Sequence, residues 1–161
     1  MDMRDIIKLV EGEVVHVDFG GRPVNKLAKL HGGAEIYAHV RLPAYDSLDD
    51  FCQGYVNAAV ALTDDIGEAT YHDFNVISLR HALHDCINFQ YDNAPDLHEY
   101  FDHQFSAFQA GHDFWMTRSG FGASFADRGL PSDLAYRLNL NARKYPEVTL
   151  VLGDDKALYF E

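Results

Sequence analysis

The chain has no long apolar run, no complete catalytic motif and little cysteine, and each absence removes a class of protein. No stretch of about 18 apolar residues occurs among its 161 residues, so the sequence predicts no membrane span. The nucleophile pattern Gly-x-Ser-x-Gly is missing, as is a complete dinucleotide or P-loop fingerprint. Cys52 and Cys86 are too few for a disulfide framework, so we expect buried free thiols in a reducing cytoplasm.

Basic residues are almost absent from the middle of the chain. Residues 46–102 contain twelve acids and one cation, Arg80, whereas residues 1–45 hold six of each and residues 103–161 hold six basic and seven acidic. Direct nucleic-acid binding by the middle third is disfavoured, because phosphate contacts need Lys and Arg. A basic protein surface is the partner that such a charge attracts. The predicted partner-binding residues are Asp46, Asp49, Asp50, Asp64, Asp65, Glu68, Asp73, Asp85, Asp92, Asp96, Glu99 and Asp102.

What the chain does contain is enough apolar material for one folded domain. Hydrophobic residues make up 47% and aromatic residues 13% of the sequence, so global disorder is excluded. We find neither a low-complexity linker nor an internal repeat. The sequence therefore predicts a single domain over 1–161, with a strand-containing extension at 1–45 and an α+β core at 46–161.

Residue spacing predicts the elements of this core. Apolar residues at helical spacing indicate helices at about 3–10, 48–63, 77–91, 95–108 and 133–144. We expect Ser47 to cap the helix at 48–63. Alternation and turn residues indicate strands at 14–19 and 35–42 and hairpins at 113–127, turning at Ser119-Gly120, and at 148–160. In 77–91 we expect an inner stripe of Leu79, Ala82, Leu83, Cys86, Ile87 and Gln90. The predicted fold is α+β, with central helices packed on a small antiparallel sheet built from the C-terminal hairpins and the N-terminal strands.

Histidines on two of the predicted helices suggest a metal site as an alternative. His81 and His84 stand one helical turn apart, and His98 and Asp102 lie on the next helix. These are plausible ligand types for zinc, but the spacing His-Glu-x-x-His is absent. Solvated histidines on a polar face are the competing interpretation, and we expect neither a metal nor another cofactor.

A second set of candidates lies at the ends of the hairpin predicted at 113–127. His112 and Asp113 open it and Asp127 and Arg128 close it, so paired carboxylates could act there as acid and base. Alternatively, Asp113 and Arg128 form an ion pair that fixes the register of the hairpin.

Three segments of the chain resemble a known group of proteins. The block GHDFWMTRSGFGASFADRGL at 111–130, the helix at 79–97 and the hairpin at 150–160 are similar to small bacteriophage and mobile-element proteins of no established activity, and the similarity covers about 50–160. Phe121 stands where that family usually has His, which argues against an essential imidazole in this loop. The resemblance implies a phage source and a cytoplasmic setting in the infected host cell.

Together, charge and resemblance favour a binding protein over an enzyme. We expect a phage accessory protein that binds a basic host or phage protein through its acidic surface, without a membrane or direct nucleic-acid contact. In its sharpest form it inhibits a host defence or nucleic-acid-handling protein, as a DNA mimic. A small hydrolase or metal-dependent enzyme, using the His and Asp residues above, and a minor virion or assembly component are the alternatives.

Overall fold

A computed structural model describes residues 42–122 and 124–161. The helix predicted at 3–10 and the strands predicted at 14–19 and 35–42 fall outside these ranges, apart from Leu42. Residues Pro43–Glu161 form one compact unit. Its elements in chain order are η1 (Tyr45–Ser47), α2 (Asp50–Leu62), η2 (Asp64–Ile66), η3 (Tyr71–Asp73), α3 (Val76–Asp92), α4 (Ala94–Asp102), α5 (Ala107–Arg118), η4 (Phe125–Arg128), α6 (Ser132–Ala142), β1 (Leu150–Leu152) and β2 (Leu158–Phe160), where η denotes a 3-10 helix.

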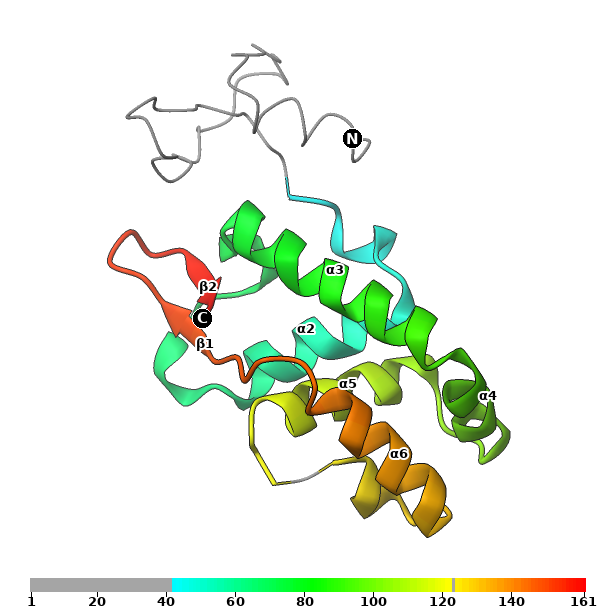
Figure 1. Ribbon diagram of the computed structural model, residues 1–161. Helices are drawn as coiled ribbons and strands as arrows, with labels where there is room; N and C mark the ends of the chain where they lie inside the picture. The colour runs from blue at the N-terminus through cyan, green and yellow to red at the C-terminus, as the bar shows by residue number, and fades with distance from the viewer. Residues whose placement is uncertain (1–41, 123) are drawn as a thin grey trace, which may run out of the picture. The chain divides into compact units, whose positions relative to one another are not determined.

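The described residues are mostly helical, with a small two-stranded sheet, which confirms the α+β class. Strands β1 and β2 pair antiparallel, with Leu150 opposite Phe160, as predicted for the last hairpin. The sheet is tied to the helices because the Asn75 N–H, just before α3, donates to the Leu158 carbonyl at 2.9 Å. Figure 1 shows this hairpin at one end of the unit and α4 and α6 at the other.

The helices pack mainly on one another, and the most extensive contact is between α2 and α5. Glycine makes this crossing possible. A Cβ atom at Gly54 would clash with the backbone carbonyl of Phe108, and one at Gly111 would clash with the carbonyl of Phe51. The backbones therefore touch at this point, an approach that only glycine allows.

Aromatic rings fill the space around the crossing. Phe89 of α3 stacks on Phe114 of α5 with ring centroids 4.2 Å apart, and Phe51 of α2 lies 5.9 Å from Phe89. Tyr55 meets Trp115 edge to face at 5.4 Å. All five side chains are fully buried, so each contributes a large apolar area to the core. The core thus joins α2, α3 and α5 into one packed unit.

Helices α2, α3 and α6 begin and end within two residues of the predicted positions. The predicted cap of the first is wrong by two residues. Asp49, and not Ser47, caps α2, because its carboxylate accepts the Cys52 N–H at 2.7 Å, while the Ser47 hydroxyl donates to the Ala44 carbonyl at 2.6 Å within the preceding turn. Among the described helices, none combines the length and apolarity needed to traverse a bilayer.

The single helix predicted at 95–108 is two helices. Helix α4 ends at Asp102, and the chain turns at Gln104, which has a φ of 69°. Ser106 then caps α5: its hydroxyl accepts the Gln109 N–H at 3.1 Å, and the Gln109 side chain accepts the Ser106 N–H at 2.9 Å. This reciprocal capping box starts a new helix instead of continuing the old one.

The hairpin predicted at 113–127 is also wrong, because 113–118 belongs to α5. Ser119 ends that helix, Gly120 follows with a φ of 72°, and the Phe121 N–H donates to the Met116 carbonyl at 3.1 Å. This is a Schellman closure. A Ser-Gly pair fits both this closure and a tight hairpin turn, since both need a positive φ at glycine.

The inner stripe predicted for 77–91 is partly wrong. Leu79, Ala82 and Cys86 are buried as expected, but Ile87 is 55% exposed and Phe89 takes a core position. Residues 87 and 89 point about 200° apart on a helix, so only one of them can face the core. Cys52 and Cys86 are buried free thiols, as predicted, and burial together with a hydrogen bond to Cys52 raises the pKa of Cys86.

Candidate functional site

Two of the twelve predicted partner-binding carboxylates cap helices. Asp49 caps α2 as described above, and its second oxygen accepts from the Gln90 side chain of α3 at 3.2 Å. Asp73 accepts the Thr70 N–H at 2.7 Å at the start of η3. Both carboxylates therefore have a local structural role, and Asp49 also links α2 to the last turns of α3.

Three more form ion pairs with arginines that lie outside the acidic third. Asp85 of α3 pairs with Arg118 of α5 at 2.8 Å. On α4, Asp96 and Glu99 pair with Arg137 of α6 at 3.0 and 3.1 Å. The sequence does not reveal this compensation, because the partners are distant along the chain. The charge that the middle third presents to solvent is correspondingly smaller than its composition suggests.

The other seven are exposed and do not form one continuous array. Asp46 and Asp50 lie at the start of α2, and Asp64, Asp65 and Glu68 follow its end. A helix of this length spans about 20 Å, more than two Debye lengths of about 8 Å at physiological salt. The two groups therefore act as separate fields. The seven exposed carboxylates are Asp46, Asp50, Asp64, Asp65, Glu68, Asp92 and Asp102.

Helix α3 presents an apolar pair to solvent. Tyr91 is 84% exposed and Ile87 is 55% exposed, and the two stand one helical turn apart on the same side. The opposite side of α3 packs into the core through Val76, Leu79, Ala82, Cys86 and Phe89. We name Ile87 and Tyr91, with the carboxylates of Asp50 and Asp92, the α3 outer face.

Carboxylates flank this pair on both edges of the helix. On one edge, the contact between Gln90 and Asp49 brings the start of α2, with Asp50, beside the last turns of α3. On the other edge, Asp92 follows Tyr91 directly and lies near Tyr145, whose pKa is raised by burial and then by the charges of Asp92 and Asp85. An apolar centre with an acidic surround is the arrangement of a protein interface with a polar rim.

Two of the predicted catalytic residues form a buried ion pair. Asp113 of α5 has a side chain only 4% exposed. Arg128 binds it with two nitrogens, Nη2 at 2.8 Å and Nε at 2.9 Å, and the Tyr100 hydroxyl donates to it at 2.9 Å. We name these three residues the Arg128 set. The carboxylate is held by three donors, which favours the structural alternative over acid–base catalysis.

The other two catalytic candidates do not complete a reactive group. The Nδ1 atom of His112 lies 3.8 Å from Asp113, too far for a hydrogen bond. Asp127 belongs to the capping box of η4, where its carboxylate accepts the Ser124 N–H at 2.8 Å. The prediction that 113 and 128 meet is confirmed, but α5 and η4 bring them together and not a hairpin.

The candidate metal ligands stay apart. His81 and His98 are exposed, and Asn88 lies 3.1 Å from the Nδ1 atom of His84. Within residues 42–122 and 124–161, no three His, Cys, Asp or Glu side chains converge as ligands for an ion. Asp102 is exposed at the end of α4.

The sequence analysis assigned no role to Arg118, which is buried. The Arg118 side chain is 4% exposed, and its Nε donates to the Pro146 carbonyl at 2.8 Å and its Nη1 to the Tyr55 hydroxyl at 3.3 Å. We name Arg118, Asp85 and Tyr55 the Arg118 set. Its signal in the sequence is weak, because an arginine near the end of a helix usually marks a solvated last turn.

Sequence reasoning also missed the α3 outer face. The helical pattern of α3 holds more apolar residues than one stripe can accommodate, and this excess was the available signal. Comparison with models of protein families, with curated proteins and with solved structures found no match for the chain. The candidate site therefore rests on the geometry alone.

Proposed function

We propose that the chain acts by binding, and that its α3 outer face captures a positively charged amphipathic segment of another protein. The observation that carries the proposal is the pairing of a Tyr91 ring, 84% exposed, with Ile87 on one turn of a helix whose edges bear carboxylates. In keeping with the resemblance of residues 50–160, we place this activity in the infected cell, with a host or phage protein as partner.

The chemistry of the face indicates the partner's chemistry. A tyrosine near the centre of a contact supplies large buried area at low conformational cost and is enriched among residues that dominate binding energy. Carboxylates on the rim attract Lys and Arg and raise the rate of encounter. The separation of the acidic groups around α2 favours a short basic segment over mimicry of a long DNA duplex.

Binding of designed peptides tests the proposal. We expect the full chain to bind an amphipathic helical peptide of Leu and Lys, and not its counterpart in which Glu replaces Lys, in isothermal titration at low salt. Affinity should fall as salt rises, because rim charges are screened. In amide NMR spectra, the largest shift changes on binding should lie in α3 and in the first turn of α2.

Matched variants separate the α3 outer face from other exposed groups. Tyr91→Ala should weaken binding about tenfold or more, as at other interface tyrosines, whereas Tyr136→Ala, which removes a ring 67% exposed on α6, should have no effect. Asp50→Asn with Asp92→Asn should flatten the salt dependence, and Asp64→Asn with Asp65→Asn should not. Equal loss in the α6 variant, or equal binding of both peptides, would contradict the proposal.

A further inference from the structure

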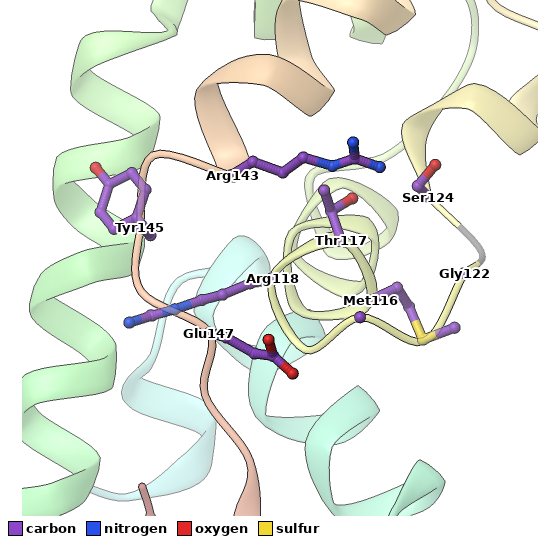
Figure 2. A pocket seen from close by; sticks show the side chains of 9 residues that line it. Met116, Thr117, Arg118, Gly122, Ser124, Arg143, Tyr145 and Glu147 are labelled. Atoms are coloured by element: carbon purple, nitrogen blue, oxygen red, sulfur yellow. The ribbon is translucent and has the colours of Figure 1, made fainter.

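A pocket of about 330 Å³ lies where the end of α5, the loop after it and the segment after α6 meet. This volume is at the small end of the range for small-molecule sites. Figure 2 shows its side chains. The lining residues are Met116, Thr117, Arg118, Gly120, Gly122, Ser124, Arg143, Tyr145 and Glu147.

The segment after α6 delivers one cation and one anion to this pocket. In Figure 2, Arg143 extends along one side toward Ser124, and the Glu147 carboxylate lies on another side of the pocket. The Glu147 carboxylate reaches the loop after α5, since a Cβ atom built at Gly120 would lie 3.6 Å from its Oε1. Tyr145, between them, turns away and packs against Phe114 with ring centroids 5.2 Å apart.

Neither charge is neutralised within the part of the chain that the structure describes. The ion pairs found there involve Arg118, Arg128, Arg137 and His112, and none within 4.0 Å includes Arg143 or Glu147. Arg118 also lines the pocket, but its guanidinium is already occupied by Asp85, Tyr55 and Pro146. Arg143 and Glu147 thus give the pocket one charge of each sign that has no ion-pair partner among residues 42–122 and 124–161.

From this pair of opposite charges we infer that the pocket binds a small zwitterion with a free carboxylate and a free ammonium group, an amino acid or a dipeptide. Arg143 binds the carboxylate, for which its planar guanidinium offers two parallel donors. Glu147 binds the ammonium group, and the thioether of Met116 contacts the apolar part of the ligand. The pocket shares no residue with the α3 outer face, although its lining residue Tyr145 lies near Asp92 of that face.

Titration calorimetry with the full chain tests the inference with four probes. L-leucine and glycyl-L-leucine carry both charges and distinguish an amino acid from a dipeptide as the preferred ligand. N-acetyl-L-leucine lacks the ammonium group, and L-leucinamide lacks the carboxylate. We expect at least one zwitterion to bind, and its blocked analogues to bind about tenfold more weakly or worse, since each loses a charge-assisted contact.

Two variants assign the roles. Arg143→Gln should make leucine and leucinamide bind alike, and Glu147→Gln should do the same for leucine and N-acetyl-leucine. Both positions are exposed, so the thermal midpoint of the unliganded protein should not change. Lys144→Gln, an exposed neighbour outside the lining, should bind as the parent does. The inference is overturned if no zwitterion binds at up to about 10 mM, if the analogues bind equally well, or if both variants keep the parent affinity.

Discussion

The Arg128 set and the Arg118 set use the same three groups, a guanidinium, a carboxylate and a tyrosine hydroxyl, but they are buried in opposite order. In the Arg128 set the carboxylate of Asp113 is the buried member, 4% exposed against 28% for Arg128. In the Arg118 set the guanidinium is buried, 4% exposed against 31% for Asp85. In both, the more exposed partner is what makes the buried charge tolerable.

The tyrosines differ in the same sense. The Tyr100 hydroxyl donates to the Asp113 carboxylate at 2.9 Å, whereas the Tyr55 hydroxyl accepts from Arg118 at 3.3 Å. Burial raises the pKa of both phenols, but Asp113 adds to the rise at Tyr100 while Arg118 opposes it at Tyr55. The sign of the buried charge therefore decides whether the neighbouring tyrosine hydroxyl donates or accepts a hydrogen bond. This difference also sets the order of the expected effects of substitution.

The largest effect is expected from removing the cation of the Arg128 set. Arg128→Leu leaves the buried Asp113 carboxylate with one donor, Tyr100, and should lower the free energy of unfolding by about 3–5 kcal/mol, as for other broken buried pairs. Asp85→Asn should cost less, about 1–2 kcal/mol, because Arg118 keeps the Pro146 carbonyl and the Tyr55 hydroxyl as acceptors. Urea denaturation monitored by circular dichroism measures both.

Arg137→Leu is the control for this comparison. It removes an arginine 39% exposed that bridges α4 and α6 at the surface, so it should lower the free energy of unfolding much less than Arg128→Leu does. If Arg128→Leu lowers the free energy of unfolding no more than Arg137→Leu does, the burial of Asp113 does not make its ion pair costly to break.

A smaller effect distinguishes the two tyrosines. Tyr100→Phe removes a short hydrogen bond to a buried carboxylate and should cost about 1.5–3 kcal/mol. Tyr55→Phe removes a longer bond from a guanidinium that has other acceptors, and should cost about 0.5–1 kcal/mol. Thermal unfolding by calorimetry compares the two variants, and an equal loss would mean that the sets do not differ in this respect.

The smallest effect comes from ionisation of the buried tyrosines, which changes stability only at alkaline pH. Burial raises the pKa of Tyr55 and Tyr100, and it raises that of Tyr71 to about 12. The stability due to these phenols is fully present below the ordinary tyrosine pKa of about 10 and is lost as pH rises through the folded-state values, because the unfolded chain ionises first. Tyrosinate absorbance and helical circular dichroism should change together above pH 10; ionisation of every tyrosine with the helices intact would contradict this.

Much of the helical framework could be predicted from local pattern. Helices α2, α3 and α6 and the last hairpin follow from apolar spacing, capping residues and proline. The segment 113–118 was predicted as a strand because Ser119-Gly120 suggested a hairpin turn after it, although the box formed by Ser106 and Gln109 signals the start of a helix. Two local signals disagreed in this segment, and the capping box at the start of the helix was the correct one.

The parts that could not be predicted depend on contacts between distant residues. Nothing near Arg118 in sequence indicates that Asp85 will meet it, and nothing near Asp96 indicates Arg137. The negative charge that residues 46–102 present to solvent was therefore overestimated. Likewise, which of Ile87 and Phe89 faces the core is decided by the aromatic rings of α2 and α5, which fit Phe89. Tertiary packing settles such choices, and periodicity alone does not.

The glycines at the crossing of α2 and α5 have a consequence for motion. Since the two main chains touch at Gly54 and Gly111, neither helix can roll or slide without driving backbone into backbone. Local opening should therefore be confined to α4, α6 and the β-hairpin, which can separate while the α2–α5 crossing stays packed. The slowest exchanging amides should accordingly cluster around these two positions, and their release marks global unfolding.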